Sequence, residues 1–177
     1  MGFVSMKPRR GNYIADYAND GDFYTLEAIA RYSRHGLDRG LRVDMVELRN
    51  AIVGAAMIRI TKFGTGGEVQ AMKELVMRHR EEFETAKDVE SSAARMLEFN
   101  IEMVHLSGNR LSRLLMNTLG PKSTQIWEAC VSFWGTESEM EQEEKIVAML
   151  EDGRGHDAAL YIEKQFDITA EGKNLRV

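Results

Sequence analysis

The sequence of 177 residues has one cysteine, two prolines and four histidines. The single Cys130 cannot form an internal disulfide, and no Cys/His spacing is typical of a zinc site, so a reducing, cytoplasmic setting is expected. No apolar run approaches the roughly 20 residues of a membrane-spanning helix, and no signal-like apolar core follows the first charges. These absences exclude a disulfide scaffold and predict neither a membrane partner nor a resident cofactor.

The first residues carry a net positive charge, whereas the rest of the chain is net negative. The formal net charge is -5, and residues 1–17 carry Lys7, Arg9 and Arg10 against Asp16 alone, so this segment is +2 and the remainder is -7. The acidic remainder argues against a nucleic-acid-binding surface over the whole chain. Eleven methionines are also present. Methionine is an adaptable core side chain that is common in irregular pockets, so it is compatible with a flexible cavity.

From residue 22 onward, apolar residues recur at three- and four-residue steps, which predicts helices. Expected caps are Asp22 for the first helix and Thr136 or Ser138 for the penultimate one, and Pro121 must break the helix it meets. The expected helices span residues 22–36, 43–64, 66–86, about 89–106, 110–120, a continuation through 134, then 136–153 and 156–171. The second is expected to be the most buried, with an apolar arc of Met45, Leu48, Ile52, Ala55, Ala56, Ile60 and Phe63. The fold class is therefore all-α, an antiparallel bundle of six to seven helices without βαβ alternation.

The first residues have a different pattern. The β-prone runs "FVSM" and "NYIADY" flank "KPRRG", which is typical of a hairpin with Pro and Gly in its turn. Two strands alone are only marginally stable, so this hairpin is expected to be packed on the bundle or to belong to something larger. We therefore divide the chain into residues 1–17, a hairpin, and residues 18–177, an all-α domain.

Few motifs point to catalysis. Glu102 and His105 share a helical face at i and i+3, which is half of a carboxylate-bridged di-metal site, but no second Glu-x-x-His exists in the sequence. The chain also lacks Gly-x-Ser-x-Gly, and Cys130 lies in apolar company where a thiol is usually inert. No enzyme is expected, and the alternative is a helical-bundle enzyme with a metal on Glu98, Glu102 and His105.

Three polar residues interrupt otherwise apolar helix faces: Arg49, Asn100 and Asp167. Buried polar groups require partners, and a cavity that holds a polar ligand is one way to supply them. Each residue taken alone is compatible with an ordinary core or rim position. Together they are compatible with a ligand pocket inside the bundle.

The order of "GFVSMKPRRGNYIADY", "DFYTLEAIARY", "VELRNAI" and "HLSGNRL" resembles the GntR family of bacterial transcriptional regulators, and within it the FadR-type subgroup. The resemblance covers nearly the whole chain. It implies an all-α effector-binding and dimerising domain preceded by the last hairpin, or wing, of a winged helix-turn-helix domain. The family's DNA-reading helices come before the wing, so we expect this chain not to read DNA by itself.

The resemblance also bears on metal binding. Many relatives bind a metal through an Asp and a His four residues apart on the fourth helix and a His on each of the last two. Met96 and Asn100 match the first pair, and Glu144 and Asp167 stand near the two histidine positions. Imidazole ligands are therefore missing, so no metal is expected. The metal-free members include fatty-acyl-CoA sensors, and either a fatty acyl-CoA or an organic acid is the expected effector.

The predicted function is effector sensing and homodimerisation in a FadR-like regulator, with ligand binding altering DNA affinity. Arg49 is expected to meet an anionic head group. Lys7, Arg9 and Arg10 match wing positions that approach DNA phosphates, with weak affinity in this chain. A ligand-free dimerisation module is a further alternative. The remaining predicted ligand-binding residues are Asn100, Asn109, Trp127, Trp134, Glu144 and Asp167.

Overall fold

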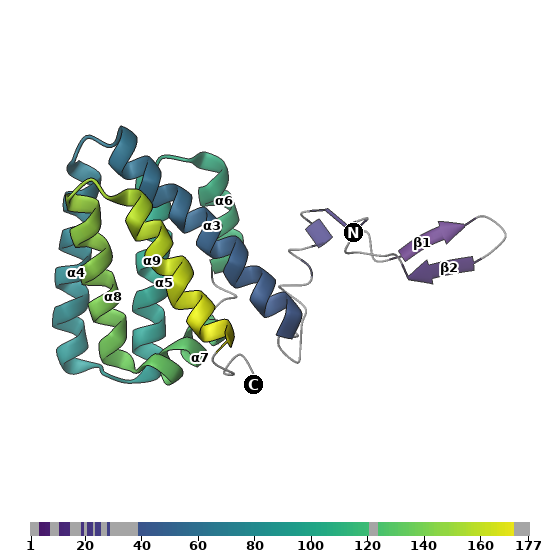
Figure 1. Cartoon of the computed structure of the whole chain (residues 1–177). Helices are drawn as coiled ribbons and strands as arrows, with labels where there is room; N and C mark the ends of the chain where they lie inside the picture. Colours follow the sequence, from purple (N-terminus) through teal and green to yellow (C-terminus); the bar gives the residue numbers. More distant parts are fainter. Residues whose placement is uncertain are drawn as a thin grey trace. The chain divides into compact units, whose positions relative to one another are not determined.

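The chain divides into two units, Met1–Leu37 and Asp38–Val177, each described by itself. The computed structural model describes residues 4–7, 11–14, 19, 21–22, 24–25, 28, 39–120 and 124–171. At 4–7, 11–14, 39, 41–42, 125 and 166–171 only the backbone is described. Figure 1 shows the course of the chain.

The first unit contains a two-stranded antiparallel hairpin. Strand β1 (Val4–Lys7) pairs with β2 (Gly11–Ile14), with Val4 opposite Ile14 and Lys7 opposite Gly11. The expected hairpin is therefore present, whereas its turn lies outside the described residues. The expected cap at Asp22 is also present, because Thr25 donates its backbone N–H to Asp22 Oδ1 over 3.0 Å. Most of the expected helix 22–36 lies outside the described residues.

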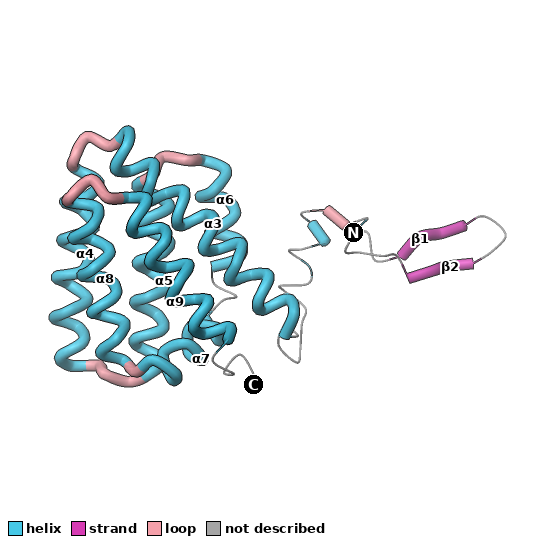
Figure 2. Tube along the Cα trace, in the orientation of Figure 1, coloured by secondary structure: helices cyan, strands magenta, loops and turns pink. Residues whose placement is uncertain are grey.

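The second unit is an all-α bundle, as expected, and Figure 2 shows helices throughout its described part. Helix α4 lies beside α8, and α3 lies beside α9 (Figure 1). The seven helices of the described residues are α3 (Arg39–Phe63), α4 (Gly67–Thr85), α5 (Val89–Leu106), α6 (Arg110–Leu119), α7 (Thr124–Trp134), α8 (Thr136–Glu151) and α9 (Gly155–Glu171).

Helix ends follow the local chemistry, with one exception. The Asp88 side chain caps α5 by accepting the Ser91 N–H over 2.9 Å. Helix α6 ends at Leu119 and α7 begins at Thr124, whereas Pro121, where a break is expected, lies outside the described residues. Neither Thr136 nor Ser138 caps α8, because Gly135 holds the cap position without a side-chain bond. At its other end, Gly153 has a φ of 73°, which a glycine adopts at little cost.

One apolar core joins the helices of this unit. The side chains of Val53, Met57, Met72 and Met103 in it are completely inaccessible to solvent. The sequence pattern placed Leu48, Ala55 and Phe63 on the apolar arc of α3, but all three are exposed, and Phe63 retains 65% of its accessible surface. The pattern was wrong here because the face packed against other helices is centred on Val53 and Met57.

Helices α3 and α9 approach each other closely where two glycines lie. A Cβ on Gly155 would lie 2.3 Å from Thr61 Oγ1 and 2.6 Å from the Met57 carbonyl oxygen, and a Cβ on Gly54 would lie 3.2 Å from that of Ala159. Backbone and short side chains cannot give way by such amounts. The two helices can pack at this distance because Gly155 has no side chain.

Gly155→Ala is therefore expected to lower the free energy of unfolding by about 1–3 kcal/mol, since the added methyl group overpacks the α3–α9 contact. Urea denaturation measures the change. Gly67→Ala is the control, because a Cβ there has only an ordinary contact of 3.5 Å with Thr65 Oγ1 and alanine favours the helix. Equal stability of the two variants would contradict the close approach.

Candidate functional site

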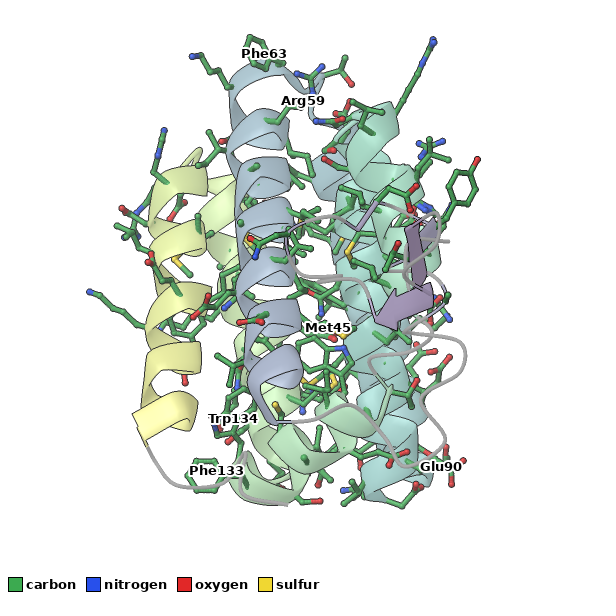
Figure 3. All side chains as sticks on the ribbon, turned by 90° about the vertical axis from the view of Figure 1, so that its right-hand side faces the viewer. Met45, Arg59, Phe63, Glu90, Phe133 and Trp134 are labelled. Carbon is green, nitrogen blue, oxygen red and sulfur yellow. The ribbon has the colours of Figure 1, made fainter. Side chains whose placement is uncertain are left out.

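A cavity lies between α3, α5, α7, α8 and α9. Its volume is about 30 Å³, enough for a couple of water molecules. In Figure 3, Trp134 at the end of α7, which lines the cavity, lies toward the same end of the bundle as Met45 on α3, opposite Arg59 and Phe63. Polar lining residues are Arg49, Asn100, Trp134, Glu139, Gln142, Glu143 and Gln165, and apolar ones are Val46, Met96, Phe99, Trp127, Cys130, Ile146 and Ile162.

Arg49 supplies the cavity's cation from the middle of α3. Its Nη2 donates to Asn100 Oδ1 over 2.5 Å, its Nη1 donates to Asn50, and its Cζ lies 4.3 Å from the centre of the Trp127 ring. Burial lowers the pKa of Arg49 to about 9, although part of the side chain reaches solvent. At neutral pH the guanidinium is still charged, and no ion pair to it is found among the described side chains.

Glu143 faces the cavity from α8 and is almost fully buried. Its Oε2 accepts a hydrogen bond from His79 Nδ1 over 2.8 Å, and His79 Nε2 lies 3.3 Å from Glu98 Oε2. Burial raises the pKa of Glu143 to about 7 despite the hydrogen bond to His79. Burial lowers the pKa of His79, but its bonds to Glu143 and Glu98 outweigh this and raise it. His79 therefore links the cavity to the surface, where Arg78 pairs with Glu98 at 2.7 Å.

A second buried pair lies next to this one. Arg95 on α5 donates from Nε and Nη2 to the two oxygens of Glu139 on α8, over 3.1 and 3.2 Å. Arg95 also donates to the Ala86 carbonyl and to Ser92 Oγ. The exposed fraction is 4% for the Arg95 side chain and 1% for that of Glu139. This pair fixes α5 to α8 and to the end of α4, and its charges are satisfied within the protein.

The cavity collects unsatisfied polar atoms. Arg49 Nε, Trp134 Nε1 and Glu143 Oε1 are the buried side-chain nitrogen and oxygen atoms that have no hydrogen-bond partner within the described part of the chain. All three residues line the same cavity. Leaving a buried donor or acceptor unpaired costs about 1–3 kcal/mol, so such atoms call for a partner. The arrangement provides two N–H donors and one carboxylate acceptor for a bound molecule.

The cavity does not favour a transition metal or a nucleophile. Its lining includes no histidine, and Met96 and Asn100 contribute a thioether and an amide in place of a carboxylate and an imidazole. Burial raises the pKa of Cys130 to about 11, so its thiol stays protonated at neutral pH. The Arg49 cation in the same cavity opposes a metal ion further. The residues present therefore do not fit a metal.

The Glu98, Glu102 and His105 alternative gains no support either. Glu98 is held by Arg78 and His79, and the Glu102 carboxylate lies 3.8 Å from His105 Nδ1 with both side chains partly exposed. His105 Nε2 instead contacts Asn117 Oδ1 over 3.0 Å. Among the residues that the structure describes, no group of three or more His, Cys, Asp or Glu side chains could hold a metal ion.

The structure brings four of the predicted ligand-binding residues together at the cavity: Arg49, Asn100, Trp127 and Trp134. Asn109 is not among its lining residues, because its side chain caps α6 by accepting the N–H groups of Leu111 and Ser112.

The remaining predicted site residues lie elsewhere. Glu144 is exposed on α8, where it pairs with Arg80, so Glu143 takes the place expected for it. The side chain of Asp167 lies outside the described residues, and Gln165 on the same helix α9 lines the cavity. Arg9 and Arg10, together with the side chain of Lys7, also lie outside the described part.

Glu143 and its partner His79 were missed in the sequence, although a signal for them exists. The acidic run at 137–144 is, from its composition and its place at a helix start, typical of a solvated face. Within it, Glu139 and Glu143 are four residues apart and share the face of Met140 and Val147, both of which are buried. A carboxylate in register with an apolar stripe indicates a buried pair or a site, in contrast to its exposed neighbours Glu141 and Glu144.

Comparisons with known proteins agree with this architecture. The model of the FCD domain family matches residues 44–166. No curated protein sequence matches significantly. Among solved structures, the chain is similar to Lar of Listeria monocytogenes, which controls the expression of the agr system and mediates virulence. Identity is 16%, the TM-score is 0.62, and the match covers 94% of this chain and 70% of the other.

A second similar structure is a GntR protein of Streptococcus agalactiae, with 15% identity, a TM-score of 0.63, and coverage of 97% of this chain and 75% of the other. At these identities the two structures support the fold alone. In the described residues, no helix has both the length and the apolar character needed to span a membrane. The family match extends over most of the chain, from α3 to α9. The chain belongs to the FCD domain family, the C-terminal domain of GntR-family transcription regulators.

Proposed function

We propose that this chain is the effector-sensing and dimerising part of a GntR-family regulator, and that the effector binds in the cavity around Arg49. Regulators of this family bind DNA and small-molecule effectors. The effector would stabilise one arrangement of the bundle and so shift a two-state equilibrium that sets DNA affinity. In this proposal Lys7, Arg9 and Arg10 contact DNA phosphates. The functional assembly is a homodimer.

The observation that carries this proposal is the buried guanidinium of Arg49. A cation that is partly removed from water costs free energy unless an anion compensates it, and here the neighbours are an amide, an indole ring and a protonated thiol. A carboxylate or phosphate on a bound molecule would supply the missing charge. Asn100 supports this role, because it donates to the Met96 carbonyl over 2.5 Å and thereby turns its Oδ1 toward Arg49.

The size of the cavity bears on the choice between an organic acid and a fatty acyl-CoA. A volume of about 30 Å³ is far below the roughly 300 Å³ at which ligand pockets begin, so any effector must widen the cavity. A small acid requires less widening than an acyl chain does. The side chains of Met96 and Ile162 can move to give such room, since methionine in particular adapts its shape at low cost.

The test is a ligand screen by thermal unfolding of the 177-residue chain. Small carboxylic acids and octanoyl-CoA form the two arms, and sedimentation velocity reports the oligomeric state in each. A ligand at a hundredfold excess over its dissociation constant is expected to stabilise the chain by about 2.7 kcal/mol. Arg49→Met should abolish the effect, whereas Glu144→Gln, on the solvent side of α8, should retain it. Absence of stabilisation by both arms would leave a ligand-free dimerisation module.

A further inference from the structure

The three unpaired polar atoms around the cavity describe a particular ligand. Arg49 Nε and Trp134 Nε1 carry hydrogens and can only donate, whereas Glu143 Oε1 accepts when the carboxyl group is ionised. Arg49 lies on α3, Trp134 at the end of α7, and Glu143 on α8, so the donors and the acceptor reach the cavity from different helices. A molecule that satisfies all three must carry acceptor oxygens at one place and a hydrogen-bond donor at another.

The charges within the cavity narrow the choice further. Arg95 and Glu139 neutralise each other, and Glu143 pairs with His79, which in turn meets Glu98. Arg49 is then the charged lining group without an ion-pair partner among the described residues. A ligand with one negative charge would neutralise it. A zwitterion would leave its positive charge uncompensated, and a dianion would add one negative charge too many.

Given the proposed effector function, we infer that the effector is a small hydroxy-monocarboxylic acid. Its carboxylate accepts from Arg49 Nε and Trp134 Nε1, and its hydroxyl group donates to Glu143 Oε1. Trp127 and Phe99 supply apolar contact to the carbon skeleton. In this arrangement Glu143 distinguishes hydroxy acids from plain acids, because a plain acid leaves the buried carboxylate oxygen unpaired. A long acyl chain has no group for that oxygen.

The experiment compares matched ligands on the 177-residue chain by calorimetry and thermal unfolding. The pairs are lactate with propionate and mandelate with phenylacetate, and alanine, lactamide and octanoyl-CoA complete the panel. At least one hydroxy acid is expected to bind about tenfold or more tightly than its plain counterpart, since a hydrogen bond to a charged group contributes about 1.5–3 kcal/mol. Lactamide should bind weakly because it lacks the negative charge.

Two conservative variants assign the contacts. Trp134→Phe keeps an aromatic ring but removes the pyrrole ring with its N–H donor. It should weaken the binding of hydroxy and plain acids alike by about tenfold. Glu143→Gln should reduce the preference for the hydroxy acid to within about threefold, because it removes the charge of the acceptor. Glu144→Gln is the matched control on the neighbouring residue. It loses only an exposed pair with Arg80 and should keep the full preference.

The preference should also depend on pH. Burial raises the pKa of Glu143 to about 7, so this carboxylate is ionised above that pH and protonated below it. Going from one unit above to one unit below this pKa, the hydroxy-to-plain affinity ratio is expected to fall severalfold, and Glu143→Gln should abolish the change. Other charged groups also lie near Glu143, and their effects on hydroxy and plain acids cancel in the affinity ratio. They are His79 on α4, Arg95 and Glu98 on α5, Glu139 on α8 and Arg49 on α3.

The outcomes separate this inference from the proposed function. Equal binding of hydroxy and plain acids, tighter binding of alanine, or an unchanged preference in Glu143→Gln would each overturn the assignment of the hydroxyl group. Stabilisation by octanoyl-CoA alone would overturn it while leaving effector sensing intact. If no compound stabilises the chain, the effector function itself fails along with the inference.

Discussion

Arg49→Met is expected to stabilise the ligand-free chain and at the same time to abolish binding of an acidic effector. Burial lowers the pKa of Arg49 from its usual range to about 9, which means that folding disfavours its charged form by several kcal/mol. Methionine has a similar length and no charge to bury. Loss of the hydrogen bonds to Asn50 and Asn100 and of the stacking on Trp127 offsets part of the gain, so a net increase of about 1–3 kcal/mol is expected.

The gain has a defined pH range. Because the pKa of Arg49 is lower in the folded chain than in the unfolded one, the penalty is complete below about pH 9 and fades as the pH rises toward the pKa of arginine in the unfolded chain. Urea unfolding at neutral pH therefore measures the full effect. The effector should lose at least about thirtyfold in affinity, since removing one partner of a buried charge pair costs about 2–5 kcal/mol.

Arg59→Met is a suitable control for the loss of an arginine from α3. Arg59 donates from its Nε to the Ser107 carbonyl over 2.8 Å at the far end of the helix, and contributes nothing to the cavity. It should lose stability slightly and leave binding unchanged. If Arg49→Met instead lowers the stability of the ligand-free chain and binding persists, Arg49 is a structural residue and the cavity is not the effector site.

The other large effect concerns the buried pair of Arg95 and Glu139. Glu139→Ala is expected to lower the free energy of unfolding by about 3–5 kcal/mol, because it leaves the Arg95 cation buried without its counter-charge. The Ala86 carbonyl and Ser92 Oγ would remain as its hydrogen-bond partners, but neither carries a charge. The link from α5 to α8 would be lost as well. Urea or thermal unfolding measures the change.

Two further variants make this result specific. Glu137→Ala removes a carboxylate from the same helix, but that residue is exposed, so a change within about 0.5 kcal/mol is expected. The double variant Arg95→Met with Glu139→Met removes both charges and keeps much of the volume. It should recover most of the stability lost in Glu139→Ala. A double variant as unstable as the single one would show that side-chain shape, and not the unpaired charge, determines the loss.

The helices could be predicted because their signals are local. Helix α5 begins and ends where the sequence indicated, since Asp88 caps it and "SGN" follows it, and both signals lie within a few residues of the helix ends. Which face of a helix is buried depends on its neighbours. The arc of α3 was placed too far toward Leu48 and Phe63, because apolar spacing alone does not tell where α9 packs.

The site was harder to predict because its chemistry is non-local. Arg49 and Asn100 were found as polar interruptions of apolar helices, and they do meet, although 51 residues separate them. The neighbouring residues Glu143 and Glu144 differ in the sequence only by register, and one is buried while the other faces solvent. Composition cannot separate them. The helical positions of the buried residues Ile146 and Val147 do separate them, because Glu143 falls on the same helix face as these two residues and Glu144 does not.

The close contact of α3 with α9 divides α3 into a longer segment before Gly54 and a shorter one after it. The 25 residues of α3 extend about 37 Å, and the glycine contact lies near Gly54, some 22 Å from the first residue, Arg39. Arg49 lies on the longer segment. By this geometry, a tilt of about 5° around that contact would displace the start of the helix by about 2 Å. A small widening of the cavity that tilts α3 would thus produce a larger displacement at Arg39, the first residue of the helix.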